Sequence, residues 1–124
     1  MIRGVRGATT VEYDKELEII EETTSLLTKM IEANQIQADD VASVFISVTE
    51  DLTSTFPAKA LRNFTGWNLV PVMCMQEIPV PNSLEKCIRI MIHVNVDREL
   101  PQKDIVHIYS RNAKKLRPDL SNMS

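Results

Sequence analysis

The segment 87–96, CIRIMIHVNV, constrains the fold more than any other stretch, because its side chains alternate with a period of two. This period is typical of a β-strand whose two faces have different surroundings. One face carries only branched aliphatic residues: Ile88, Ile90, Ile92, Val94 and Val96. The other face is mixed: Cys87, Arg89, Met91, His93 and Asn95. A helix can cover the first face. The second must meet another layer, a second subunit or a ligand, and Arg89 near its middle needs an explanation.

Apolar runs bounded by turn residues predict four further strands. They lie at residues 2–11, 41–48, 69–77 and about 105–109. Gly4 and Gly7 in the first strand indicate a close backbone approach or a bulge. The fold class is therefore α+β (mixed α/β), with about five strands and one long helix.

The long helix should run from about Asp14 to Asn34, with Asp14 as its N-cap and two glutamates in the first turn. Helical spacing predicts a buried stripe of Leu17, Ile20, Leu27, Met30 and Ile31. Pro57 should open a short helix, since proline is favoured in a first helical turn.

A chain of 124 residues is enough for one domain, residues 1–124, with a polar C-terminal tail from about residue 111 that we expect to be mobile without a ligand. So short a chain leaves apolar strand faces that a partner subunit can cover. No apolar run has the length of a membrane span, and the N-terminus does not resemble a signal peptide. Cys74 and Cys87 fit neither a metal motif nor a disulfide scaffold, which favours a cytoplasmic protein with free thiols.

Charge is distributed unevenly along the chain. Residues 1–56 carry 11 acidic and 4 basic residues, whereas residues 57–124 carry 6 acidic and 10 basic residues. The basic residues are scattered through predicted strands and turns. A nucleic-acid stripe would be continuous, so this pattern argues against nucleic acid and is compatible with convergence on a small anion.

Four polar side chains stand in apolar strands or at their ends: Arg6, Glu77, Arg89 and Tyr109. Burying an unpaired arginine is costly, so two explanations compete. One is a structural ion pair between Arg89 and Glu77, or an arginine on a solvated face. The other is an anion pocket. If the third strand stays regular, Cys74 and Glu77 point to opposite faces, so they can share a pocket only if the strand ends or bulges before Glu77.

Other kinds of site are weakly indicated. No glycine-rich phosphate loop occurs. His93 and His107 lack partners at metal-ligand spacing, so no metal is expected. A nucleophilic Cys–His pair remains open, although strand cysteines are usually only buried.

The chain resembles the AroH-type chorismate mutases, the small monofunctional class. The segments that carry the resemblance follow one another along the chain: IRGVRGATTVE, FPAKALR, GW, VPVMCMQE, KCIRIMI and LRPDLS. The resemblance implies a mixed five-stranded sheet with one long helix, assembled as a homotrimer that forms a pseudo α/β barrel with active sites between subunits. It implies the Claisen rearrangement of chorismate to prephenate, in phenylalanine and tyrosine biosynthesis, without a cofactor.

The resemblance also implies roles for individual residues. Arg6 and Tyr109 would bind carboxylates, Arg89 the ether oxygen and a carboxylate, and Glu77 with Cys74 the ring hydroxyl. Phe56, Ala58, Lys59, Arg62 and Met73 would line the pocket, and Leu116 and Arg117 would close over the ligand. Met73 stands where the family pattern has threonine, so this side chain offers no hydroxyl.

Arg89 would then be a cation desolvated before the substrate arrives, placed where negative charge develops. Two alternatives remain: an imine-hydrolysing deaminase of similar trimeric architecture, and a trimeric binding module without activity.

Overall fold

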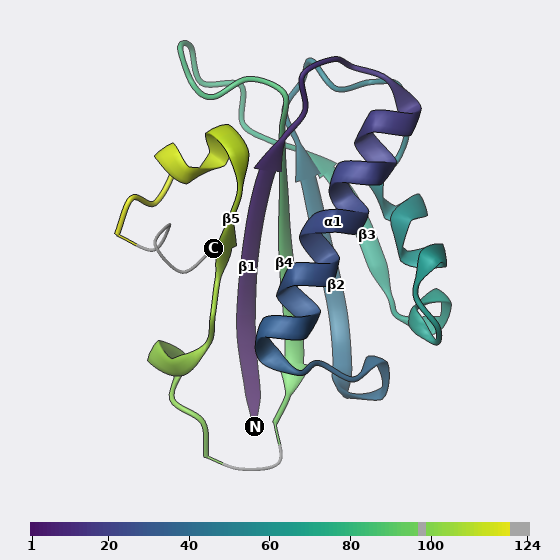
Figure 1. The fold of residues 1–124 in the computed structure, drawn as a ribbon, viewed down its shortest axis with the longest axis vertical. Helices are drawn as coiled ribbons and strands as arrows, with labels where there is room; N and C mark the ends of the chain where they lie inside the picture. The colour runs from purple at the N-terminus through teal and green to yellow at the C-terminus, as the bar shows by residue number, and fades with distance from the viewer. Residues whose placement is uncertain (97–98, 120–124) are drawn as a thin grey trace.

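The computed structural model describes residues 1–96 and 99–119. One sheet with α1 (Glu16–Asn34) lying across it forms the body of the molecule (Figure 1). The sheet order is β3-β2-β4-β1-β5. The strands are β1 (Ile2–Thr10), β2 (Val41–Val48), β3 (Val72–Gln76), β4 (Cys87–Asn95) and β5 (Ile108–Tyr109). β4 pairs antiparallel with β1 and β2, while β5 and β3 join in parallel at the two edges, so the predicted mixed five-stranded sheet is confirmed.

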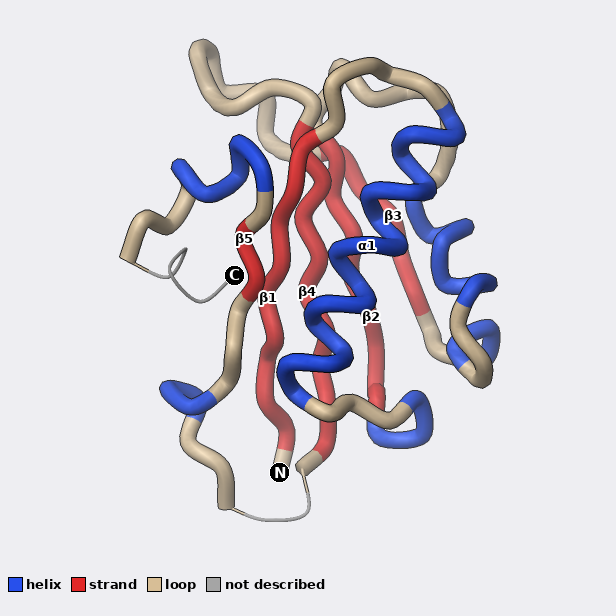
Figure 2. Tube along the Cα trace, in the orientation of Figure 1, coloured by secondary structure: helices blue, strands red, loops and turns tan. Residues whose placement is uncertain are grey.

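Short 3₁₀ helices occupy several connections (Figure 2). They are η1 (Ala38–Asp40), η2 (Pro57–Asn63), η3 (Trp67–Leu69), η4 (Gln102–Asp104) and η5 (Arg111–Lys115). η2 begins with proline as predicted, although it is a 3₁₀ rather than an α-helix. Of the expected tail, residues 120–124 lie outside the described residues, and mobility of the tail stays a prediction.

The predicted N-cap of the long helix is wrong by one residue. α1 begins at Glu16 with Lys15 as its N-cap, and Lys15 makes no side-chain capping bond. Asp14 instead accepts hydrogen bonds from the backbone N–H groups of Thr53 and Ser54, both at 3.1 Å. The Asp14 carboxylate thus binds a loop that is distant in sequence. A rule for local helix capping cannot predict such a contact.

The predicted buried stripe of α1 is corrected in part. The buried residues are Ile19, Thr23, Leu26, Leu27 and Met30. Leu17 is 69% exposed. It precedes Ile19 by two positions, which is about 200° around a helix, so burying Ile19 turns Leu17 outward.

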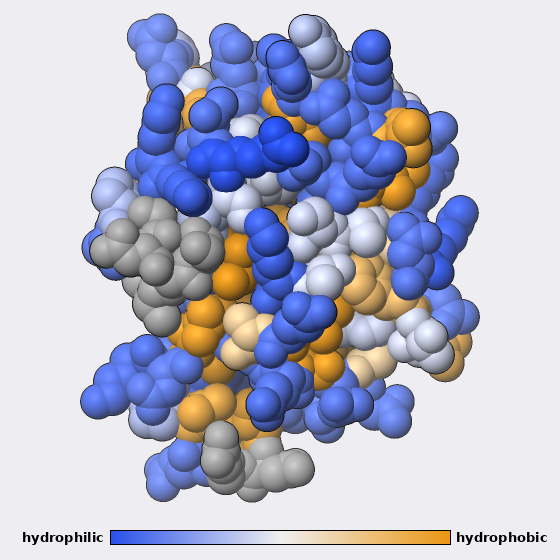
Figure 3. Space-filling model, viewed as in Figure 1, coloured by the Kyte–Doolittle hydropathy of each residue, from blue (hydrophilic) through white to orange (hydrophobic). Residues whose placement is uncertain are grey.

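The sheet has two different faces. α1 and η2 pack on one face over the core formed by β2, β4 and β1, and seen from this side the surface of the molecule is mainly hydrophilic (Figure 3). Gly7 in β1 allows α1 to lie close, because a Cβ at this position would stand 2.3 Å from Met30 Sδ. The opposite face is open over much of its area and exposes Phe45 and Met75, so it is the face available for a site or a partner.

Within residues 1–96 and 99–119, none of the helices combines the length and the hydropathy that crossing a membrane requires.

Candidate active site

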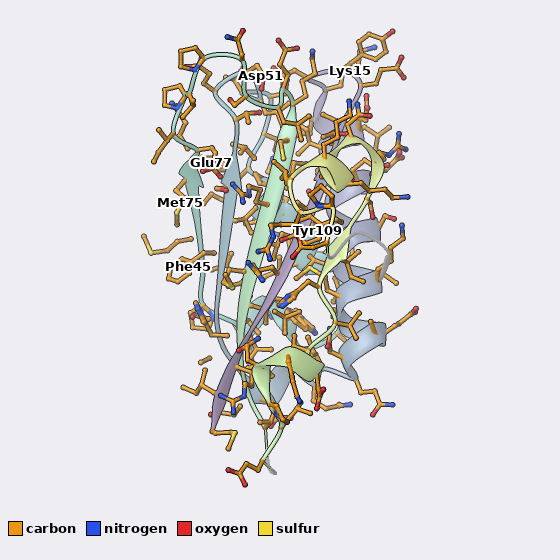
Figure 4. The ribbon with its side chains drawn as sticks, turned by 90° about the vertical axis from the view of Figure 1, so that its left-hand side faces the viewer. Lys15, Phe45, Asp51, Met75, Glu77 and Tyr109 are labelled. Atoms are coloured by element: carbon orange, nitrogen blue, oxygen red, sulfur yellow. The ribbon has the colours of Figure 1, made fainter. Side chains whose placement is uncertain are left out.

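A cavity of about 260 Å³ lies on the sheet face opposite α1. Arg6, Glu77, Arg89 and Tyr109 all line it. Figure 4 shows Glu77 and Tyr109 in a side view of the sheet, with Glu77 on the side away from α1. The four polar residues singled out in the sequence are therefore brought together in one place.

Strand register explains why these residues meet. Arg89 in β4 pairs with Ser47 in β2 on one side and with Ala8 in β1 on the other. Ala8 in turn pairs with Tyr109 in β5. Ala8 thus lies between Arg89 and Tyr109 in the sheet, and its side chain is buried beside Tyr109 and Ala113. Arg6 lies two residues before Ala8, so it projects on the same face.

Glu77 and Arg89 form an ion pair at the cavity wall. Arg89 Nη1 lies 3.4 Å from Glu77 Oε2, and the same oxygen accepts a 2.8 Å hydrogen bond from Ser47 Oγ. The side chain of Arg89 is 45% exposed and that of Glu77 is 30% exposed. In a single chain much of the Arg89 guanidinium therefore meets solvent, and desolvation of Arg89 before substrate binding stays a prediction for the assembled protein.

Arg6 and Tyr109 complete the wall at the junction of β1 and β5. The backbone N–H of Arg6 donates to His107 Nδ1 at 2.9 Å. Burial lowers the pKa of His107, and the positive charges of Arg6 and Arg117 lower it further, so the imidazole is neutral near pH 7. Tyr109 is almost completely buried and packs against Ala8, which holds its ring at the cavity edge.

Cys74 does not share this cavity. It lines a different one, of about 490 Å³, together with Phe56 and Lys59. β3 ends at Gln76, but the N–H of Glu77 still donates to Val48 O at 2.8 Å. The alternation thus continues through Glu77, and Cys74 and Glu77 stay on opposite faces as strand parity requires.

The η2 segment carries most of the remaining predicted residues. Phe56, Ala58, Lys59 and Arg62 line a third cavity of about 270 Å³. Lys59 Nζ is held by Glu16 Oε2 at 2.8 Å, and this hydrogen bond lowers the pKa of Glu16. Phe56 is 69% exposed, and Met73, 63% exposed, lines none of these three cavities. In a single chain the predicted residues therefore form two groups. One lines the cavity with Arg89, and the other consists of Cys74, Met73 and the residues at and within η2.

Leu116 and Arg117 lie beyond η5. Leu116 packs against the buried cluster of Ala8, Tyr109 and Ala113, next to the first cavity. Arg117 forms a two-point ion pair with Asp119, at 2.9 and 3.1 Å, and this hydrogen bonding holds the pKa of Asp119 below its usual range. Leu116 is thus placed near the site, whereas Arg117 is engaged with its own segment.

Nucleophilic chemistry finds little support here. Burial raises the pKa of Cys74, and it raises that of Cys87 to about 11, so both side chains are thiols near neutral pH. His93 bonds Ser43 and His107 bonds the Arg6 backbone, so neither imidazole pairs with a cysteine in the described part of the chain. Two arginines, a tyrosine and a carboxylate suit binding and electrostatic stabilisation of an anion that also carries a hydroxyl.

Sequence reasoning missed Ser47, which contacts Glu77 directly. A signal was present in the segment 41–48, VASVFISV. Ser43, Phe45 and Ser47 lie on the face opposite α1, and they alternate with aliphatic residues that face the core. A serine there is unremarkable until the register places it beside Arg89, and register comes from long-range pairing.

Comparison with known proteins identifies the family. The family model for chorismate mutase type I matches residues 2–120. The chain is 52% identical to chorismate mutase AroH of Bacillus subtilis, over 98% of this chain and 94% of that protein. It is 48% identical to chorismate mutase AroH of Thermus thermophilus, over 98% of each. A solved chorismate mutase from Clostridium thermocellum superposes with a TM-score of 0.85 at 50% identity, covering 90% of this chain and 97% of that one. The chain therefore belongs to the chorismate mutase type I family.

Proposed function

We propose that this protein is a chorismate mutase, an isomerase that converts chorismate to prephenate in aromatic amino acid biosynthesis. The observation that carries the proposal is the arrangement of Arg6, Glu77, Arg89 and Tyr109 around one cavity. Family membership and relatives named as chorismate mutases support it, and they favour it over an imine-hydrolysing deaminase or an inactive binding module.

The rearrangement suits these residues because it needs no nucleophile and no proton transfer. One C–O bond breaks as one C–C bond forms, and the ether oxygen gains negative charge in the transition state. A protein can accelerate such a step by holding the substrate in its reactive conformation and by placing a fixed cation beside that oxygen. Arg89 takes the second task, since its planar fork can span the ether oxygen and a carboxylate together.

The other residues of this cavity hold the dianion. Arg6 and Tyr109 bind carboxylates, and Glu77 accepts a hydrogen bond from the ring hydroxyl. Leu116 and Arg117 close over the ligand, which requires the pair between Arg117 and Asp119 to open. No cofactor takes part in this scheme.

The predicted residues that lie outside the Arg89 cavity, on β3 and around η2, complete the site from a neighbouring subunit. A cavity of about 260 Å³ is below the roughly 300–1,000 Å³ typical of small-molecule sites, as expected for half a site. In the proposed homotrimer, the face carrying Cys74 and η2 meets the Arg89 cavity of the next subunit. Cys74 then contacts the ring hydroxyl, and Phe56, Ala58, Lys59, Arg62 and Met73 line the remaining wall.

Exposed apolar residues support this assembly. Phe45, Met73 and Met75 on the open face are 37%, 63% and 42% exposed, which is unusual for neighbouring strand residues in a monomer. Covering them with other subunits removes that surface from water and desolvates Arg89, as the mechanism requires. The two free cysteines fit the cytoplasm, the compartment we propose for the protein.

One assay tests the function. Purified protein is mixed with chorismate, and the loss of chorismate ultraviolet absorbance is followed against a protein-free control. We expect a rate enhancement of at least about 10⁶-fold, as enzymes typically give. A rate equal to the uncatalysed one would remove the proposal. Sedimentation equilibrium tests the assembly separately, with a mass of three chains expected.

A further inference from the structure

The contact between Ser47 and Glu77 is not used by any role assigned so far. Ser47 Oγ donates to Glu77 Oε2 at 2.8 Å, and Arg89 Nη1 lies 3.4 Å from the same oxygen. Among residues 1–96 and 99–119, no group bonds the other oxygen, Oε1. One carboxylate oxygen is therefore held by the protein, and the other has no partner among the described residues.

Backbone pairing supports the same placement. Glu77 lies just beyond the end of β3, where a side chain would otherwise have considerable freedom. Its N–H donates to Val48 O at 2.8 Å, and its carboxylate accepts from the adjacent residue, Ser47. Two consecutive residues of β2 thus hold both the backbone and the carboxylate of Glu77. The same strand pairs with β4 so that Ser47 lies opposite Arg89.

We propose that Ser47 is a positioning residue for the reaction and acts through Glu77; this rests on the proposed function. By occupying Oε2, the Ser47 hydroxyl directs Oε1 toward the ring hydroxyl of the substrate. By sharing Oε2, it also limits how closely the carboxylate approaches Arg89, which leaves guanidinium N–H groups for the ether oxygen. Misplacing a group by about 1 Å can cost about 10²-fold in rate, so a single hydrogen bond here has a measurable effect.

The test compares Ser47→Val with Ser47→Thr. Threonine and valine have nearly the same shape and both suit a strand, but only threonine retains a hydroxyl. We expect Ser47→Val to lower kcat/KM by about 10-fold to 10²-fold, and Ser47→Thr to remain within about 3-fold of the wild type. Equal activity of the two variants would overturn the proposal, because shape rather than the hydroxyl would then decide.

Ser43→Ala is the matched control. Ser43 lies on the same strand and the same face, four residues away, and its hydroxyl bonds His93 Nδ1 at 3.1 Å outside the cavity. We expect Ser43→Ala to keep kcat/KM within about 2-fold of the wild type, whereas Ser47→Ala falls by about 10-fold or more. A similar loss in both variants would indicate a general effect of strand polarity and would contradict a specific role.

A double-mutant cycle shows whether Ser47 acts through Glu77. Glu77→Asp retracts the carboxylate from Ser47 by one methylene while keeping its charge at the cavity. In this background we expect Ser47→Ala to change kcat/KM by less than about 2-fold, since coupled residues are not additive. The full Ser47→Ala loss in this background would overturn the proposal. If the wild type accelerated nothing, the proposed function would fail, and this inference with it. If the wild type were active and Ser47→Ala matched it, only the inference would fail.

Discussion

Arg89 has neighbours from the proposed site on both sides in the sheet. Ser47 and Glu77 lie toward β3, and Ala8 and Tyr109 lie toward β5. Arg89 Nη1 lies 3.4 Å from Glu77 Oε2, which is longer than a good charge-assisted hydrogen bond. The guanidinium is thus held near a carboxylate and still has N–H groups that can bind a ligand. This geometry suits a cation that must serve a ligand.

Arg89→Lys tests this reading at the level of one side chain. Lysine keeps the charge but loses the planar fork that spans two oxygens. We expect kcat to fall by about 10² to 10³, the usual effect of losing one preorganised donor. The readout is steady-state conversion of chorismate by the purified variant.

Arg3→Lys is the control for this substitution, because Arg3 Nε donates to Leu100 O and lies outside the cavity. Its kcat should stay near the wild-type value. Near-normal turnover of Arg89→Lys would contradict the electrostatic role.

Protonation of His107 should make the stability of the protein depend on pH. Its Nδ1 accepts from the Arg6 N–H, so protonation would remove an acceptor. The pKa of His107 is lower in the folded chain than its ordinary value, so the unfolded chain binds the proton more tightly. The stability contributed by the neutral imidazole is therefore complete above the unfolded pKa of about 6.5 and is lost as the pH falls from there through the lower pKa of the folded chain.

His107→Asn should remove this pH dependence. Its amide oxygen can accept from the Arg6 N–H and does not titrate. We expect the Tm of the wild type to fall relative to that of the variant as the pH falls from about 7 to about 5. His93→Asn serves as control, because His93 bonds a hydroxyl that can donate or accept. A difference that stayed constant with pH would contradict this assignment.

At the scale of elements, the contact between β1 and α1 sets how the helix lies over the sheet. Gly7 is a point of close approach, since a Cβ added there would clash with Met30 Sδ. The first strand carries Arg6, which lines the cavity, and Ala8, which packs against Tyr109, on its other face. Packing on one face of β1 therefore affects where the site residues stand on the other.

Gly7→Ala should destabilise the protein. The Met30 side chain must move, and overpacking of this kind typically costs about 1–3 kcal/mol. Gly4→Ala is the matched control, since its added Cβ would meet Met91 Sδ at an ordinary 3.4 Å. Denaturant unfolding at one fixed protein concentration measures both. Equal stability of the two variants would show that Met30 yields at no cost.

At the scale of the whole molecule, the proposed site is divided between two faces. Arg89 and Glu77 line one cavity, while Cys74 and η2 line others. A closed ring of three identical chains can join these two surfaces at each of its interfaces. The division seen in one chain is then what a shared site requires.

Complementation tests the shared site. Arg89→Ala disables one half, and Arg62→Ala weakens the other, so each variant alone should have low activity. When the two variants are co-expressed in equal amounts, about a quarter of the clefts combine two intact halves, so activity should approach about a quarter of the wild-type value. Activity equal to the mean of the two parent variants would indicate that each chain holds a complete site.

The sequence by itself determined the five strands and the long helix. Alternation in 87–96 predicted β4 and its two faces, and the polar residues within apolar strands singled out Arg6, Glu77, Arg89 and Tyr109 as members of either an ion pair or an anion pocket. These signals are local, because period and residue type depend on near neighbours. Asp14 and Leu17 were misassigned because a distant loop and a packed sheet outweighed the local rule.

Only the tertiary structure decided which residues share a cavity. The order β3-β2-β4-β1-β5 places strands side by side that are far apart in the chain, and register then decides which side chains meet. That is why Ser47 is opposite Arg89 and why Arg6, Arg89 and Tyr109 line one cavity. Pairing between distant strands depends on the packing of the whole core, so no short segment of sequence contains it.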